Sequence, residues 1–321
     1  MKKLIFSILV LGVLFFLNTS SVSYPKEIVG KDTAVAEILE KLGDTPLPHK
    51  PDMSMAGVSV ENGRDIIFTG YSRKPSGRKS KVQSRHFKCT ACHNMEREDP
   101  DLSVSDPEAR LAYAKKNNLP FLQGTTLHGV VNRTKFYNGD YKEKYGDLVA
   151  KARNNLREAT QLCATACAQG RELEDWEIES VLAYFWSLDL KLKDLDLSDK
   201  EYTSINNAMD NSEKKTAAIT LLKSKYLDAS PANFLIPPPD RKKGYGLKGD
   251  PENGKVIYNL SCLHCHKGAK YSFFTLDDSK YSHKLLDKNM AKYTRYSLYQ
   301  VGRYGTHPLN GKRGYMPHYT K

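Results

Sequence analysis

The sequence predicts a mostly α-helical protein made of two domains joined by a long, partly helical linker. Three observations lead to this prediction. With 321 residues, the chain exceeds the usual size of a single domain. The five-residue pattern C-x-x-C-H occurs twice, at 89–93 and 262–266, in separate sequence contexts. Apolar residues also recur at helical spacing, most clearly after the first copy at Ile178, Val181 and Leu182.

Residues 1–23 are predicted to be a secretory signal peptide. Lys2 and Lys3 supply its positive start, residues 4–17 an apolar stretch, and the small residues 21–23 a cleavage site. The alternative is an uncleaved membrane anchor. The 14 residues of the apolar stretch would rise about 21 Å as a helix, which is short of the roughly 30 Å hydrocarbon core of a bilayer. We therefore expect an exported protein without a stable membrane anchor.

The two C-x-x-C-H copies predict covalent attachment of two c-type haems. In this motif two cysteine thiols add to the haem vinyl groups, and the adjacent histidine ligates the iron. With 6 Cys and 9 His in the chain, chance gives roughly 0.003 such matches. A pair of zinc half-sites is the rival interpretation, but neither copy has a second matching pair of ligands. The residues concerned are Cys89, Cys92 and His93 in the first copy and Cys262, Cys265 and His266 in the second.

Residues 24–190 are expected to form the first domain. A connector with several prolines at 43–51 precedes an amphipathic helix at 61–68, and an aromatic-rich helix at 172–188 closes the domain. Acidic residues crowd the start of the closing helix, as a helix N-terminus prefers. A helix ahead of C-x-x-C-H and a second helix at the end of the domain resemble the arrangement of class I cytochrome c.

Residues 191–249 are predicted to be a linker. Ser212 is expected to cap a helix that runs through Ala217 to Leu222. Three consecutive prolines at 237–239 then enforce an extended, semi-rigid stretch.

Residues 250–321 are expected to form a second cytochrome c-like domain. Asp250 suits a helix N-cap and Pro251 the first helical position. Only five residues follow Met316, too few for the closing helix of such a domain. We therefore expect the C-terminal helix to be missing and the sequence to be a fragment.

Each haem iron needs a second axial ligand, and elimination narrows the choice. In the first domain Met95 lies too close to His93 to reach across the haem. The remaining candidates are His128, Cys163, Cys167 and several lysines. In the second domain we expect Met316, in the loop 314–317, to ligate the iron. The other methionine, Met290, lies in a predicted helix and is expected to pack in the core.

The first domain resembles the corresponding domain of dihaem thiosulfate dehydrogenases and of the related haem-bearing proteins of sulfur-oxidation systems. The resemblance rests on 129–133, on Cys163 seven residues before Gly170, and on the helix that follows. It implies His93/Cys163 ligation of the first iron. The insertion before Cys89, the loop 137–145 and the additional Cys167 depart from the pattern. A disulfide between Cys163 and Cys167 is the alternative, because two cysteines remain after haem attachment and the compartment is oxidising.

These expectations predict a periplasmic electron-transfer protein. A thiolate favours ferric iron, and a His/Met pair raises the reduction potential, so electrons would pass from the first haem to the second and on to an acceptor. The alternative is an enzyme that oxidises or couples sulfur oxyanions at the first haem. In that case Cys163 would be catalytic, and Arg133 would hold the anion.

The charge distribution points to the kind of partner. Residues 241–321 contain 16 Lys and Arg against 5 Asp and Glu, which accounts for +11 of the net charge of +12. We expect this basic half to dock an acidic redox partner protein, with general solubility as the alternative. Export and haem attachment argue against nucleic acid as the partner.

Overall fold

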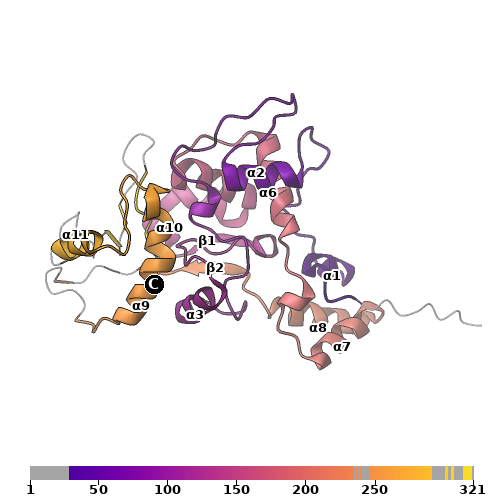
Figure 1. The fold of residues 1–321 in the computed structure, drawn as a ribbon. Helices are drawn as coiled ribbons and strands as arrows, with labels where there is room; N and C mark the ends of the chain where they lie inside the picture. Colours follow the sequence, from indigo (N-terminus) through magenta and orange to yellow (C-terminus); the bar gives the residue numbers. More distant parts are fainter. Residues whose placement is uncertain are drawn as a thin grey trace, which may run out of the picture.

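The computed structural model describes residues 29–234, 236, 239–240, 246–290, 301–302, 305–306 and 314–319. The predicted signal peptide at 1–23 lies outside the described residues. Within them the protein is mostly helical, as the sequence predicted (Figure 1). Strand structure there is limited to one two-stranded sheet. The longer helices are α1 (Val35–Lys41), α2 (Val60–Thr69), α3 (Pro107–Asn117), α5 (Leu156–Leu162), α6 (Asp175–Ser187), α7 (Asp199–Met209), α8 (Ser212–Lys223), α9 (Pro251–Ile257) and α11 (Lys280–Met290), with the short α4 (Tyr141–Tyr145) and α10 (Leu263–His266) between them.

Helices α2 and α6 pack directly on each other (Figure 1), and α2 also contacts the turn of the first cysteine motif. Their contact requires glycine at position 63, since a Cβ there would lie 1.9 Å from the carbonyl oxygen of Ser180. Both helices were predicted, and both are confirmed. Helix α6 begins at Asp175 because Glu174 and Glu177 form a reciprocal capping box at its start.

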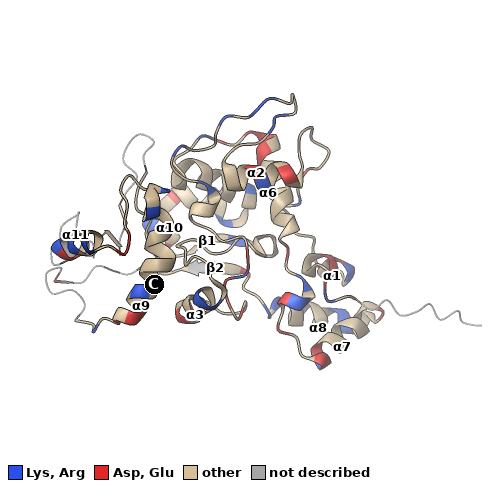
Figure 2. Ribbon diagram, viewed as in Figure 1, with Lys and Arg blue, Asp and Glu red and all other residues tan. Residues whose placement is uncertain are grey.

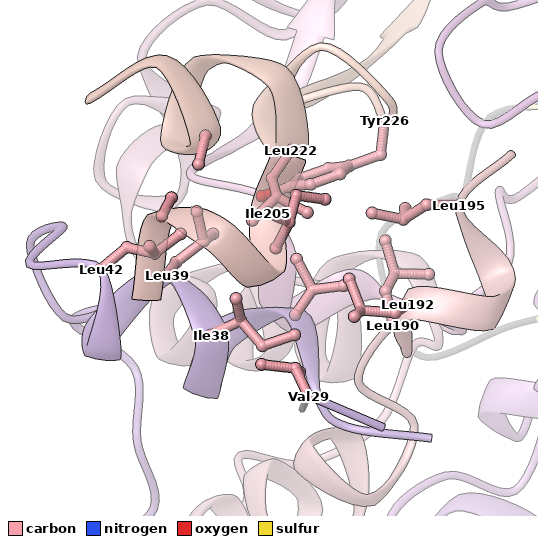
Figure 3. Packing of buried hydrophobic residues seen from close by; sticks show 13 residues of the cluster. Val29, Ile38, Leu39, Leu42, Leu190, Leu192, Leu195, Ile205, Leu222 and Tyr226 are labelled. Atoms are coloured by element: carbon pink, nitrogen blue, oxygen red, sulfur yellow. The ribbon is translucent and has the colours of Figure 1, made fainter. Parts of the chain in front are cut away.

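A separate hydrophobic cluster joins α1 to α7 and α8 (Figure 3). Ile38, Ile205 and Leu222 are fully buried in it. The cluster therefore links residues 29–42, near the start of the described chain, with residues 190–226, which include most of the predicted linker. Burial of this apolar surface orders the segment as packed helices.

The helix predicted in the linker is present as α8, but its cap was assigned one residue too late. Asn211, with extended backbone angles, accepts a hydrogen bond from the Glu213 backbone N–H at 3.0 Å and is the N-cap. Ser212 is instead the first helical residue. Asparagine and serine cap helices about equally well, so the two neighbouring positions are not distinguished by residue type.

The sheet pairs β1 (Lys135–Gly139) with β2 (Ala229–Ala232) in parallel. The register is irregular between Lys135 and Asn138, where β1 bulges. Beyond β2, the Phe234 backbone N–H donates to Asp140 Oδ2 at 2.8 Å, which holds the end of the strand against the first domain. Of the three consecutive prolines expected to extend the chain here, Pro237 and Pro238 lie outside the described residues.

The second cysteine motif follows α9, whose start was predicted correctly. Asp250 Oδ1 accepts from the backbone N–H groups of Glu252 and Asn253, and Pro251 occupies the first turn. Figure 2 shows acidic and basic positions together on α9 and α11. Of the 16 basic residues in 241–321, seven are lysines in the described part, which also holds all five acidic residues. Most of the predicted basic surplus therefore falls outside it.

Candidate haem attachment site

The first motif forms a tight turn that holds His93 partly buried. Cys89 to Ala91 make a single 3₁₀ turn, and the His93 backbone N–H donates to the Cys89 carbonyl at 3.0 Å. The His93 Nδ1 hydrogen-bonds the Thr125 carbonyl at 2.7 Å. Because a carbonyl only accepts, Nδ1 carries the proton and Nε2 keeps its lone pair for a metal. Burial lowers the pKa of His93, which favours the neutral, ligating form.

The loop that carries Thr125 is held in place by hydrogen bonds. Glu98, only 1% exposed, accepts hydrogen bonds from Asn94 Nδ2, Arg110 Nη2 and the Thr126 backbone N–H at 2.8, 3.1 and 2.6 Å. Arg110 also donates to the Leu122 carbonyl at 2.7 Å. These bonds hold the carbonyl of the neighbouring residue 125 against the imidazole. Sequence inspection missed Glu98 and Arg110, since neither belongs to a motif.

Gly124 lies against the imidazole of His93. A Cβ at this position would approach His93 Cε1 and Nδ1 and the Cys92 carbonyl oxygen to 2.6 Å each. Its backbone N–H donates to that same carbonyl at 2.9 Å. The absence of a side chain therefore allows the loop to close over the ring.

Arg133 extends beside this histidine. Its Nη1 donates to Thr125 Oγ1 at 3.2 Å, and burial lowers its pKa. Glu98 and Asp99 act on it electrostatically, but within the described part of the chain it makes no ion pair. A half-buried guanidinium without a paired carboxylate favours binding of an anion.

Cys163 and Cys167 lie on one side of a π-helical turn, Cys163–Cys167, that continues α5. The turn is closed by the Ala168 backbone N–H, which donates to the Cys163 carbonyl at 2.7 Å. Both cysteines are free, so the structure contains no disulfide between them. Their thiols are instead hydrogen-bonded to each other, with the Tyr137 hydroxyl beside Cys167. π-Turns of this kind are frequent at functional sites.

The structure brings this cysteine pair to the first motif. After the hydrogen bond to Cys167 and burial, the proximity of Cys89 and Cys92 also raises the pKa of Cys163. The Cys163 thiol donates to Cys167, which raises the pKa of Cys163 and lowers that of Cys167. Accepting hydrogen bonds stabilises a thiolate, so Cys167 is the sulfur that ionises more easily.

His128, the other candidate ligand, lies beside Asp194. Its Nε2 lies 3.6 Å from Asp194 Oδ2, and this histidine counteracts the effect of burial and leaves the pKa of Asp194 lowered. Asp189 also interacts with it electrostatically. The Nε2 of His128 is buried and makes no hydrogen bond within the described part of the chain, so His128 stays a candidate ligand.

In the second motif the histidine is held more loosely. A π-helical turn, Tyr258–Cys262, leads into α10, which ends at His266. The His266 Nδ1 meets the Phe274 carbonyl at 3.4 Å, and the two rings are tilted with centroids 4.4 Å apart. Burial lowers the pKa of His266. Nearby apolar side chains are exposed, with Phe273 at 93% and Tyr281 at 88%.

The two motifs are in direct contact, which nothing in the sequence indicated. His264 Nε2 meets the Thr90 carbonyl at 3.1 Å, and Cys265 Sγ lies 4.0 Å from the Ala91 carbonyl. Just before the second motif, the Leu260 carbonyl accepts a hydrogen bond from the Phe121 backbone N–H at 3.0 Å. These contacts join the two motifs, which are far apart in the chain, through both main-chain and side-chain atoms.

The loop around Met316 packs between the motifs. The Met316 backbone N–H donates to Thr306 Oγ1, and the Met316 carbonyl accepts from the Thr306 backbone N–H, both at 2.8 Å. Next to it, Tyr315 packs edge-on against Phe87 with ring centroids 5.5 Å apart. None of the hydrogen bonds or ring contacts of the described residues joins Met316 to His266. Ligation by Met316 stays a prediction, and the side chain of Met290 lies outside the described residues.

Aromatic side chains lie beside the cysteine pair. Tyr137 and Tyr141 meet edge to face with centroids 5.2 Å apart, and Phe234 lies 5.1 Å from Tyr141. Burial raises the pKa of both tyrosines, and Cys167 contributes by its charge. The loop 137–145 was noted in the sequence as a departure from the resembling family, but its contact with the cysteines was not foreseen.

Neither a ready-made metal cluster nor a membrane span is found in the part of the chain that the structure describes. No group of three or more His, Cys, Asp or Glu side chains there is arranged to hold a metal ion. Among the same residues, no helix has the length and apolar character needed to cross a membrane. Comparison of the chain with known protein families, curated proteins and solved structures finds no match.

Proposed function

We propose that this chain is an exported dihaem c-type cytochrome, with class I cytochrome c-like domains at 24–190 and 250–321 and a partly helical linker at 191–249. One observation carries the proposal. His266 is buried and His93 is partly buried, each is bonded through Nδ1 to a backbone carbonyl, and the two motifs touch. This leaves Nε2 of each histidine as the atom for a metal.

The residues present fit haem. At the first motif, Gly124 lets its loop pack against the Nδ1 edge of the imidazole, and Arg133 supplies a half-buried positive charge suited to an acidic group. At the second, exposed aromatic side chains offer apolar surface for a macrocycle. When bound, the cofactor would supply one-electron oxidation and reduction. Cys89 with Cys92 and Cys262 with Cys265 would form the thioether bonds, and His93 and His266 would ligate iron.

The remaining ligands set the direction of electron flow in this proposal. Cys163 would place a thiolate on the first iron, and Met316 a thioether on the second. Thiolate stabilises the ferric state, whereas a Met/His pair raises the reduction potential. These ligands favour transfer from the first motif to the second, and the contact of Thr90 with His264 makes that path short.

The proposed location and partner follow from the sequence. Residues 1–23 would direct export to the periplasm and be removed, leaving no stable membrane anchor. The surplus of positive charge in 241–321 would attract an acidic redox protein. Low salt should speed this association, because exposed charges are screened over about a Debye length.

Mass spectrometry of the exported protein tests the proposal. The intact mass should exceed that of the mature polypeptide by two haems. Replacing Cys89 and Cys92 together by alanine should remove one haem, and so should replacing Cys262 and Cys265. The double variant of Cys163 and Cys167 is the matched control and should keep both haems. An exported wild-type chain without haem would contradict the proposal.

Arg133 supports a second candidate function, the oxidation or coupling of small sulfur oxyanions at the first haem. It is half-buried, cationic and without an ion-pair partner among the described residues. Its guanidinium suits an oxyanion such as thiosulfate. Addition of thiosulfate or tetrathionate should then change the haem spectrum and support turnover. Replacement of Arg133 by Lys, which keeps the charge and loses the fork of donors, should raise KM, whereas Cys163→Ala should abolish turnover.

A further inference from the structure

The pair Cys163 and Cys167 has a geometry that haem attachment does not require. Consecutive hydrogen bonds fix the turn between them. Gln83 Nε2 donates to the Ala164 carbonyl at 2.7 Å, and Ser84 Oγ to the Ala168 carbonyl at 2.5 Å. Gly170 permits this approach, since a Cβ there would lie 2.1 Å from Gln83 Nε2. The loop before the first motif therefore anchors the turn that carries both thiols.

The turn places the two sulfur atoms together. Residues four apart on a helix have Cα atoms about 6 Å from each other, within the range that disulfides span. Because the turn closes through a five-residue hydrogen bond, these two positions lie more nearly one above the other than in an α-helix. The thiols are already in hydrogen-bond contact. Formation of a bond between them needs little movement of the backbone.

Tyr137 is directed onto this pair by an irregular strand. Its backbone adopts a left-handed conformation, with φ of 51°, which is uncommon for a residue with a side chain. It lies where the register of β1 shifts between Lys135 and Asn138. Bulges commonly redirect a side chain beside a functional site. Here the bulge turns the phenol inward to Cys167 and to the Ala159 carbonyl, 3.3 Å away.

We propose that Cys163 and Cys167 are a third redox centre, a dithiol that closes reversibly to a disulfide beside the first motif. Closure breaks two S–H bonds and forms one S–S bond, releasing two protons and two electrons. The inference rests on the proposed function for its electron acceptors, two ferric c-type haems that take one electron each. The Tyr137 hydroxyl, beside Cys167, is placed to relay a released proton.

The centre would also control the first site. A sulfur atom engaged in a disulfide no longer offers a thiolate, so closure would withdraw Cys163 from the iron. In the reduced pair Cys163 remains available. The oxidation state of the pair would thus select between two ligand sets at the first motif.

Thiol counting on the haem-loaded, full-length protein tests this proposal. The protein is equilibrated at graded potentials with mixtures of reduced and oxidised dithiothreitol, quenched, denatured and alkylated with N-ethylmaleimide. We expect two labels, both within 163–167, at the reducing end and none at the oxidising end. The transition should follow a two-electron slope, with a tenfold change in the ratio about every 29.6 mV. The electron paramagnetic resonance signal of thiolate-ligated iron should disappear over the same range.

Three variants sharpen the test. Cys163→Ser and Cys167→Ser should each carry one label at every potential. Tyr137→Phe keeps both thiols but removes the hydrogen bond to the dithiol form, so the equilibrium should move about fivefold toward the disulfide. Haem binding measured by absorbance on each variant reports folding. A wild-type protein that keeps two labels at all potentials overturns the proposal. Failure of haem attachment would appear separately, as extra labels at the four cysteines of the C-x-x-C-H motifs.

Discussion

The two motif histidines, His93 and His266, differ in how firmly the surrounding residues hold them. At the first motif the bond from His93 Nδ1 to the Thr125 carbonyl measures 2.7 Å, and the loop beneath is held by the buried Glu98. At the second, the corresponding bond from His266 measures 3.4 Å, and its acceptor residue Phe274 is partly exposed. The first site is preorganised by a buried polar network. The second depends on the group that binds there to complete its core.

Replacement of Glu98 is expected to have the largest effect on the difference between the two histidine sites. Its replacement by Ala leaves the Arg110 guanidinium buried without its carboxylate, and it removes the acceptor for the Thr126 backbone N–H. We expect a loss of about 3 to 5 kcal/mol in the free energy of unfolding, measured by urea denaturation. Glu252→Ala, in the first turn of exposed α9, is the control and should change stability by less than about 1 kcal/mol. Equal effects of the two would show that the first site is not specially braced.

Glycine to alanine substitutions compare the two regions with the same chemical change. At Gly124 the new methyl group would lie 2.6 Å from the His93 ring, and at Gly254 it would meet nothing within 4 Å. Gly124→Ala should destabilise by about 1 to 3 kcal/mol and perturb the spectrum of the first haem. Gly254→Ala lies within α9 and should stabilise by about 1 kcal/mol or less. Thermal unfolding and absorbance spectra measure both, and a silent Gly124→Ala would refute the close packing of this loop.

Two aspartates should respond to pH in opposite directions. Burial raises the pKa of Asp99 to about 6 from an ordinary value of 3.8, so its ionisation opposes folding as pH rises through that interval. Asp99→Asn should therefore stabilise the protein above about pH 6 and have no effect below the ordinary pKa. Part of the carboxyl meets solvent, which screens it, so the expected gain is about 1 kcal/mol.

Asp277, in the second region, is the counterpart. Hydrogen bonds from Ser279 and Ser282 lower its pKa to about 2 from 3.8. Its contribution to stability is present above the ordinary pKa and is lost as pH falls through about 2. Asp277→Asn should lower the melting temperature at neutral pH, and the difference from wild type should vanish near pH 2. The same sign for both aspartates at neutral pH would contradict the assigned environments.

The smallest effect on stability is expected for Thr125→Val. The substitution preserves the size of the side chain and the carbonyl that holds His93, but it removes the hydroxyl that accepts from Arg133. We expect a loss of about 1 kcal/mol in unfolding free energy. The ligation of the first iron should be unchanged in the absorbance spectrum. Displacement of His93 in this variant would show that Arg133 and the imidazole are coupled.

The amino-acid sequence was sufficient for features that depend on neighbouring residues. The helical character of α2 and α6 follows from apolar spacing, and the start of α9 from Asp250 and Pro251. The prediction of haem attachment also rests on neighbouring residues, two cysteines and a histidine on one short turn, and it stays a prediction. The choice of Ser212 over Asn211 as a cap was wrong by one residue, where two equally suitable side chains adjoin.

Only the tertiary structure decided which residues that are distant in the sequence come into contact. The contact of Thr90 with His264, the pairing of His128 with Asp194, and the packing of α7 and α8 on α1 each join residues far apart in the chain. The bulge that directs Tyr137 to Cys167 depends on a strand that returns from position 229. Local spacing determines turns and helix faces over a few residues. Contacts across many positions depend on the path of the whole chain and on which surfaces it buries together.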